Sequence, residues 1–123
     1  MTDDRKQYGH GSEAAAARHL AREGYKILER NHRNRLGEID IIARHKGVWV
    51  FVEVKARRGK GFGDPKWAVT PAKQRKLSMV ALAYLKHIRA LEQKARFDVV
   101  TVVNDGDMPR FEVIANAFEL AYP

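Results

Sequence analysis

One run of residues constrains the fold of this 123-residue chain more than any other. Residues 37–44 read GEIDIIAR, residues 45–47 supply a short turn, and residues 48–56 read VWVFVEVKA. β-Branched and aromatic residues on both sides of a short turn predict an antiparallel hairpin. The second strand carries apolar residues at both parities, so we expect it to be central in a sheet that is covered on both faces.

The flanking segments predict the helices that cover this sheet. Ser12 is a suitable N-cap for a helix over residues 13–23. A second helix is expected over residues 71–91, where Thr70 precedes Pro71 and proline suits the first helical position. Its apolar residues recur with a helical period.

The remaining elements follow from alternation and turn residues. Further strands are expected at residues 25–33, 96–103 and 110–114, with a loop at 57–69 and a helical turn at 116–121. Residues 1–10 are polar and are expected to be frayed. The order αβββαββ predicts one α/β domain over residues 1–123, with a mixed central sheet flanked by helices.

Composition limits the functional classes. The chain has no cysteine, which excludes disulfides, thiolate zinc sites and a cysteine nucleophile. Its longest uncharged stretch, residues 77–85, is about half of a membrane span. Charged residues also stand where a signal peptide would be apolar, so we expect a cytoplasmic protein. A net charge of +8 favours an anionic partner such as nucleic acid, although a solvated basic surface would give the same total.

Three charged residues fall inside the apolar hairpin. Glu53 and Lys55 share one face of their strand with Trp49 and Phe51, about 6.6 Å apart along the strand. Asp40, which shares its parity with Glu38, can face Glu53 across the hairpin. Ionised groups are costly inside a sheet unless they are paired or bind a metal.

Two carboxylates that converge there would form a hard-oxygen site for Mg²⁺ or Mn²⁺, with Lys55 beside it to stabilise charge on phosphorus. Glu13, on the apolar stripe of the first helix, can add a third carboxylate. The alternative is an ordinary ion pair between Glu53 and Lys55 at a strand end, with Asp40 in a turn. Asp98, between Phe97 and Val99, is expected to serve the fold by capping or by pairing with an arginine.

The hairpin GEIDIIARHKGVWVFVEVKAR resembles the PD-(D/E)xK nuclease signature, in which an Asp precedes an E-x-K by one hairpin. The chain as a whole resembles the YraN family of uncharacterised bacterial proteins over about residues 9–118. The residues that carry this resemblance include Gly37-Glu38-Ile39-Asp40, Phe51-Val52-Glu53-Val54-Lys55, Phe62-Gly63, Lys73 and Arg96-Phe97-Asp98-Val99. One departure is that Ile39 stands where the signature has its proline.

This resemblance implies a restriction-endonuclease-like αβββαβ core, similar to that of archaeal Holliday junction resolvases. It implies that Asp40, Glu53 and the Val54 carbonyl ligate Mg²⁺ or Mn²⁺, that Lys55 is the catalytic lysine, and that Glu13 is an accessory acid. Resolvases of this type act as dimers, so it also implies a homodimer, for which the sequence identifies no interface.

Basic residues gather after the hairpin. The residues expected to contact nucleic-acid phosphates are Arg57, Arg58, Lys60, Lys66, Lys73, Arg75 and Lys76. The last three lie in the first turns of the second helix, where cations oppose the helix dipole unless an anion arrives. Phe62 and Trp67, in the same glycine-rich loop, can stack on bases or anchor the loop to the core.

We therefore expect a metal-dependent endonuclease that hydrolyses DNA phosphodiester bonds, at branched or structured DNA. One alternative is a non-catalytic nucleic-acid-binding module on the same fold. Another is a protein-interaction domain whose acidic C-terminal region docks on a basic partner. Intact Asp40, Glu53 and Lys55 favour the first hypothesis over the second, since a site without chemistry has no reason to keep all three.

Overall fold

The computed structural model describes residues 4–58, 69–104, 106 and 108–119. Its elements, in chain order, are α1 (Asp4–Arg22), β1 (Lys26–Asn34), β2 (Gly37–His45), β3 (Val48–Arg58), α2 (Pro71–His87), β4 (Ala95–Asn104) and β5 (Arg110–Phe118). This confirms the predicted order of helices and strands. No helix in the described part of the chain is both long and apolar enough to cross a membrane.

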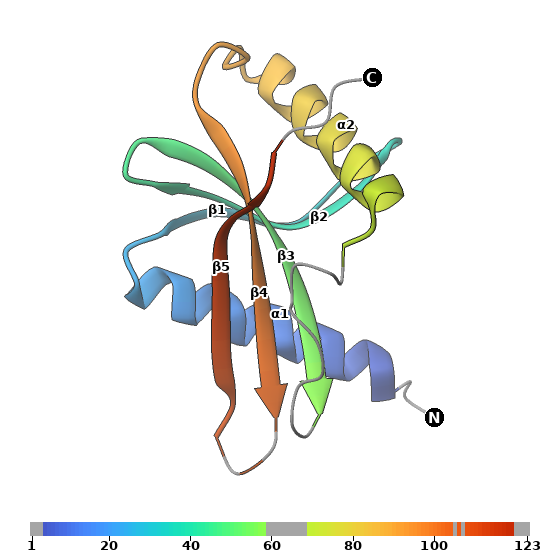
Figure 1. Cartoon of the computed structure of the whole chain (residues 1–123), viewed down its shortest axis with the longest axis vertical. Helices are drawn as coiled ribbons and strands as arrows, with labels where there is room; N and C mark the ends of the chain where they lie inside the picture. The colour runs from blue at the N-terminus through green and yellow to red at the C-terminus, as the bar shows by residue number, and fades with distance from the viewer. Residues whose placement is uncertain (1–3, 59–68, 105, 107, 120–123) are drawn as a thin grey trace.

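The strands form one sheet in the order β1-β2-β3-β4-β5 (Figure 1). β3 pairs parallel with β4, and the other neighbouring pairs are antiparallel. The sheet is therefore mixed and β3 is its central strand, as the sequence predicted. The parallel step from β3 to β4 requires a long crossover, which includes α2.

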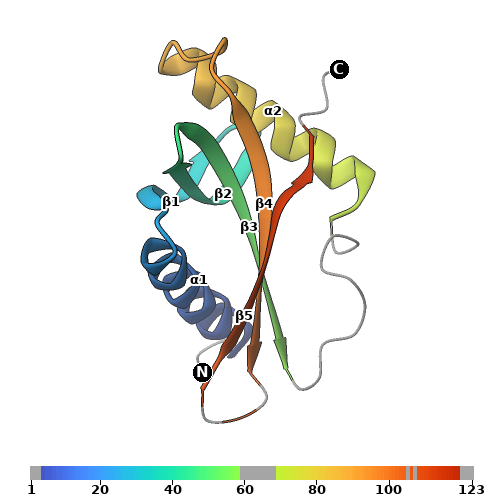
Figure 2. The same ribbon diagram turned by 60° about the vertical axis from the view of Figure 1, so that its left-hand side comes forward.

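The two helices cover opposite faces of the sheet (Figure 2). Phe51 belongs to the core beneath α2, with Leu77, Val80 and Leu85 of that helix. Val50 and Val52 belong to the core beneath α1. Successive β3 residues thus point into two different cores, which explains why the strand is apolar at both parities.

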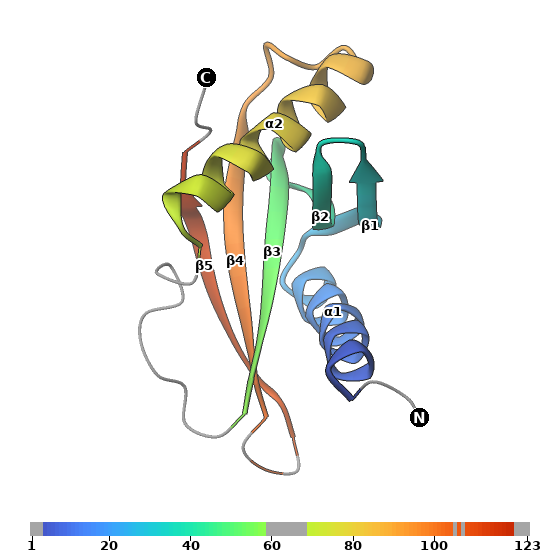
Figure 3. The same ribbon diagram turned by 90° about the vertical axis from the view of Figure 1, so that its right-hand side faces the viewer.

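β2 leaves β3 part of the way along the hairpin. The pairing between these strands runs from His45↔Val48 to Ile41↔Val52 and stops there. Ile39 lies in the α2-side core and Ile41 in the α1-side core, so the alternation of faces breaks at the residue between them, which is Asp40. Figure 3 shows the β1–β2 pair turned away from the long strands β3, β4 and β5.

Both helices differ from their predicted bounds. α1 begins at Asp4, so Ser12 is a buried residue within the helix and not its N-cap. Residues 4–10 are helical where fraying was expected, because a glycine costs a helix only about 1 kcal/mol per position; residues 1–3 lie outside the described part. α2 ends at His87, and Arg89 has a left-handed φ of 59° that turns the chain before Leu91.

Two predicted segments near the sheet edges also differ. Arg57 and Arg58 belong to β3, so the predicted loop begins later, and residues 59–68 lie outside the described part. The helical turn expected at residues 116–121 was wrong, because β5 continues to Phe118. The Phe118 ring stacks on Phe97 with 4.5 Å between centroids, which holds the last residues of β5 on the sheet; residues 120–121 are not described.

Candidate metal and phosphate site

The candidate site lies where β2 and β3 separate. Asp40 is the residue that would pair with Glu53 if the hairpin ladder continued beyond Ile41↔Val52. Instead, the Asp40 carboxylate replaces a ladder bond, because its Oδ2 accepts a hydrogen bond of 2.8 Å from the Val54 backbone N–H. The separation of the two strands therefore makes space for side chains, and the Asp40 carboxylate lies in that space.

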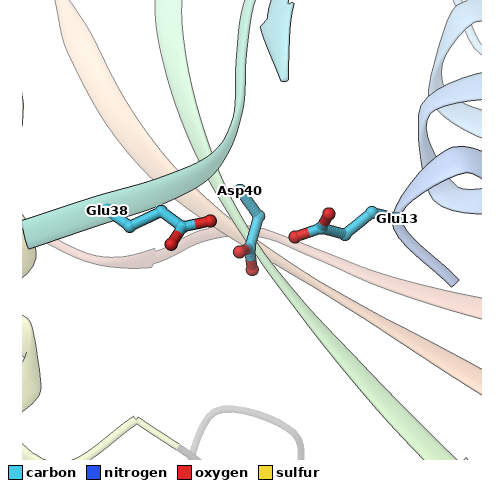
Figure 4. A group of neighbouring side chains, drawn as sticks. All are labelled: Glu13, Glu38 and Asp40. Atoms are coloured by element: carbon cyan, nitrogen blue, oxygen red, sulfur yellow. The ribbon is translucent and has the colours of Figure 1, made fainter. Parts of the chain in front are cut away.

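Three carboxylates converge at this point. Ligand oxygens of Glu13, Glu38 and Asp40 all lie within 4.8 Å of one another. Figure 4 shows them directed toward a common centre, Glu13 from α1 and the other two from β2. All three side chains are half-buried. The predicted inward direction of Glu13 is thus seen in the structure.

This crowding of acids affects the pKa of Asp40. Burial is the largest cause that raises the pKa of Asp40 to about 8, followed by the charge of Glu53. A hydrogen bond with Glu13 and the charge of that residue raise the pKa further, whereas the Val54 N–H lowers it. The carboxyl group therefore holds a proton well above the ordinary range of an aspartate.

Glu53 is buried, with 8% of its surface exposed, and two lysines contact it. Lys73 Nζ lies 2.6 Å from Glu53 Oε1, and Lys55 Nζ lies 3.4 Å from the same oxygen. The alternative ion pair between Glu53 and Lys55 is therefore present together with the acid cluster. Burial and the neighbouring Lys73 lower the pKa of Lys55, whereas the hydrogen bond to Glu53 and the charge of that residue outweigh burial and raise the pKa of Lys73.

Carboxylate oxygens in this arrangement suit a hard divalent cation such as Mg²⁺ or Mn²⁺. Glu13, Glu38 and Asp40 are close enough to share one ion, and Glu53 lies near enough to Asp40 to raise its pKa. The predicted ligand Asp40 belongs to this group of three acids, whereas the predicted ligand Glu53 lies beside the group and is not one of the three. The described contact of Val54 with this site is made by its N–H, which binds Asp40.

Two residues that take part in this site were not predicted from the sequence. Glu38 shares the parity of Asp40 and follows Gly37 at the start of β2, a signal that could have identified it; it also pairs with Arg33 at 2.9 Å. Asn31 has a left-handed φ of 55° and lies against Glu13. With its amide nitrogen turned to that carboxylate, it donates bonds of 2.5 and 3.0 Å to the two oxygens.

The predicted phosphate-binding residues divide into three groups. Arg75 and Lys76 are exposed in the first turns of α2, and Lys73 in the same turns is bound to Glu53. Arg57 is half-buried near the end of β3, where Arg58 is the last residue. The predictions for Lys60, Lys66, Phe62 and Trp67 lie outside the described residues.

Asp98 has the fold role that the sequence predicted. It is fully buried, and its two oxygens accept from Arg96 Nε at 2.9 Å, Tyr25 Oη at 2.7 Å and the Asn116 N–H at 2.9 Å. The cluster joins the segment before β1 with β4 and β5, and these contacts include no second carboxylate. It therefore joins strands and forms no cation site.

Comparisons with known proteins agree with the resemblance seen in the sequence. The profile of "Uncharacterised protein family UPF0102" matches residues 12–102. A UPF0102 protein of Geobacter metallireducens is 50% identical over 122 residues, which cover 99% of this chain and 100% of that protein. One of Geobacter sulfurreducens is 51% identical over 118 residues, covering 95% of this chain and 92% of the relative.

Among solved structures, SfsA of Pyrococcus furiosus in complex with Ca²⁺ is similar with a TM-score of 0.38 and 15% identity. The match covers 91% of this chain and 62% of that chain. The family profile spans most of the chain, and half of the residues are identical to those of full-length relatives. The chain therefore belongs to the UPF0102 family, also called the YraN family.

Proposed function

We propose that this chain is a metal-dependent nuclease that hydrolyses phosphodiester bonds in DNA, at branched or structured sites. The observation that carries the proposal is the position of Asp40. Its half-buried carboxyl group lies with those of Glu13 and Glu38 at a break in the sheet, close to Glu53, and accepts a hydrogen bond from the Val54 N–H. Such a group of acids costs free energy unless a cation neutralises it.

The residues of the site divide the chemistry among them. Mg²⁺ or Mn²⁺ would polarise a phosphoryl oxygen and neutralise charge that develops on it. Asp40 and Glu53 would hold the cation together with Glu13 or Glu38. Several carboxylates would then share one ion. Lys55, next to Glu53 at 3.4 Å, places an ammonium group beside the reacting phosphate, where it stabilises negative charge.

Basic side chains near the site support a nucleic-acid substrate. Arg75 and Lys76 are exposed on α2. The first turn of the same helix also carries Lys73, whose side chain contacts Glu53. This first turn contains no acidic residue. Cations at a helix N-terminus oppose its dipole, and an incoming phosphate removes that cost.

Cleavage assays with four-way and duplex DNA, in Mg²⁺ or in Mn²⁺, test the catalytic claim. The wild type should cut and Glu53→Gln should bind the same DNA without cutting. The matched control is Glu92→Gln, which changes an exposed acid outside the site and should cut like the wild type. If the wild type binds DNA but is as inert as Glu53→Gln in every metal, the chain is a non-catalytic binding module instead.

A second assay tests the basic surface. The variant Arg75→Glu with Lys76→Glu should weaken DNA binding and lower the slope of its salt dependence by about 2, because roughly one counterion is released for each neutralised phosphate. Unchanged affinity and slope would remove these two residues from the DNA interface.

A further inference from the structure

Among the described residues, the closest cation to Glu53 comes from a helix and not from the E-x-K strand. Lys73 Nζ lies 2.6 Å from Glu53 Oε1, whereas Lys55 Nζ lies 3.4 Å from it. Both lysine ammonium groups thus contact the same oxygen of the buried Glu53 carboxylate. The Glu53 carboxylate is also the group that a divalent cation would bind if Glu53 were one of its ligands.

The position of Lys73 is set by the start of α2. Thr70 is the N-cap, and its Oγ1 accepts a 3.2 Å hydrogen bond from the Lys73 backbone N–H. Pro71 follows at the start of the helix. The cap fixes where the Lys73 side chain begins, and the side chain, with 39% of its surface exposed, reaches from solvent to Glu53.

Space adjoins the Lys73 side chain. A pocket of about 200 Å³ is lined by Gly37, Glu38, Lys73, Lys76, Leu77 and Val80. It connects the acid cluster, through Glu38, with the first turns of α2. A lysine has four rotatable side-chain bonds, so the Lys73 ammonium can leave Glu53 without movement of the helix.

We propose that Lys73 is a positioning residue that neutralises Glu53 in the ion-free site and competes with the divalent cation for this carboxylate. When the cation binds, the Lys73 ammonium is released from Glu53 and becomes available to the phosphate of the substrate. The inference rests on the proposed function, because it assumes that Glu53 is a ligand of the cation.

Mn²⁺ binding to the purified full chain tests this inference without any activity measurement. Calorimetry and the electron paramagnetic resonance signal of free Mn²⁺ would both report the affinity. Lys73→Met should bind Mn²⁺ about fivefold more tightly than the wild type, since a half-exposed ion pair that must be broken is worth up to about 1 kcal/mol. Lys86→Met removes an equal charge from the last turn of the same helix, away from the site, and should change the affinity less than about twofold.

The double variant separates direct competition from the general field of the lysine. In the Glu53→Gln background, Lys73→Met should leave Mn²⁺ affinity unchanged within about twofold, because the two residues then no longer share an ion pair. Lys73→Arg, which keeps the pair, should bind Mn²⁺ like the wild type. Lys73→Gln serves in place of Lys73→Met if the latter does not fold.

Two results would overturn the inference while the metal-dependent function stands. One is equal Mn²⁺ affinity in the wild type and Lys73→Met. The other is a gain from Lys73→Met that persists in full in the Glu53→Gln background. Absence of saturable Mn²⁺ binding in all variants would instead reject the metal-dependent function, and the competition with it.

Discussion

Two aspartates in one sheet, Asp98 fully buried and Asp40 half-buried, have opposite surroundings. Asp98 accepts hydrogen bonds from Arg96, Tyr25 and the backbone of Asn116, so donors surround both of its oxygens. Asp40 accepts a described hydrogen bond from the Val54 N–H, and the carboxylates of Glu13 and Glu38 lie close to it. Burial of an acid therefore does not by itself mark a functional site. What marks such a site is the balance between hydrogen-bond donors and further acids around the carboxyl group.

The two regions also use basic side chains differently. Arg96 binds Asp98 directly, with Nε 2.9 Å from Oδ1, and the pair is enclosed by strands. Lys55 and Lys73 both bind Glu53, which leaves the acids at Asp40 without a described ion pair to either lysine. The Asp98 cluster is thus complete within the chain, whereas the Asp40 site favours an added positive charge.

The largest effect that follows from this comparison is on the stability of the Asp98 cluster. Asp98→Ala should lower the free energy of unfolding by about 3–5 kcal/mol, because it leaves the partly buried Arg96 charge and the Asn116 N–H without their acceptor. Urea denaturation followed by circular dichroism would measure this. A loss below about 1 kcal/mol would contradict the structural role assigned to Asp98.

Replacement of the other aspartate should act in the opposite direction. The pKa of Asp40 is about 8 in the folded chain, against an ordinary value of 3.8. Between these values the folded chain binds a proton that the unfolded chain has released, so the free energy of unfolding falls as pH rises from about 4 to about 8. Asp40→Asn should remove this dependence and should be more stable than the wild type by about 2 kcal/mol near pH 8, well below the roughly 5–6 kcal/mol that the full shift implies, because solvent screens the half-buried carboxyl group.

Urea denaturation in the presence of a chelator, at about pH 5 and about pH 8, measures this difference. The wild type and Asp40→Asn should have similar stabilities at the lower pH and diverge at the higher one. Parallel pH profiles would show that the acids around Asp40 do not raise its pKa in solution.

A smaller effect is expected at Tyr25, which donates a 2.7 Å hydrogen bond to Asp98. Burial and this bond raise the pKa of Tyr25 to about 12. Tyr25→Phe should cost about 1–2 kcal/mol of unfolding free energy, because it removes one donor and keeps the ring. Tyr84→Phe is the matched control, since the Tyr84 ring packs against Phe51 and no hydroxyl bond of Tyr84 is described; it should cost less than about 0.5 kcal/mol. Equal losses would indicate that the Tyr25 ring, and not its hydroxyl, supports the cluster.

Strand parity predicted a central β3 and placed Glu53 and Lys55 on one face of it. The predicted pairing of Asp40 with Glu53 was wrong, because the β2–β3 ladder stops one step earlier, at Ile41↔Val52. Parity could not show that β2 leaves β3 at that point, because the separation depends on how the strands twist against α1 and α2. The Asp98 pairing was predictable because Arg96 stands two residues away on the same strand.

The contact between Lys73 and Glu53 could not be predicted from the sequence, for a related reason. A cation in the first turn of a helix is typical of a phosphate contact, and that was the prediction for Lys73. Its ion pair with Glu53 depends on where the α2 N-terminus lies over the sheet. That position is a result of core packing by Leu77, Val80 and Leu85, which local patterns do not encode.

The smallest predicted effect concerns the helix that serves only one of the two regions. Thr70 caps α2 through the 3.2 Å bond from the Lys73 N–H, whereas the Asp98 cluster is built from strands and the segment before β1. Thr70→Ala should cost about 1 kcal/mol, and Thr70→Ser, which keeps the hydroxyl, should cost less. Amide hydrogen exchange should quicken in the first turn of α2 in Thr70→Ala, while the amide of Asn116 keeps its protection. Faster exchange at both places would mean that the two regions unfold together and that the separation drawn between them does not hold.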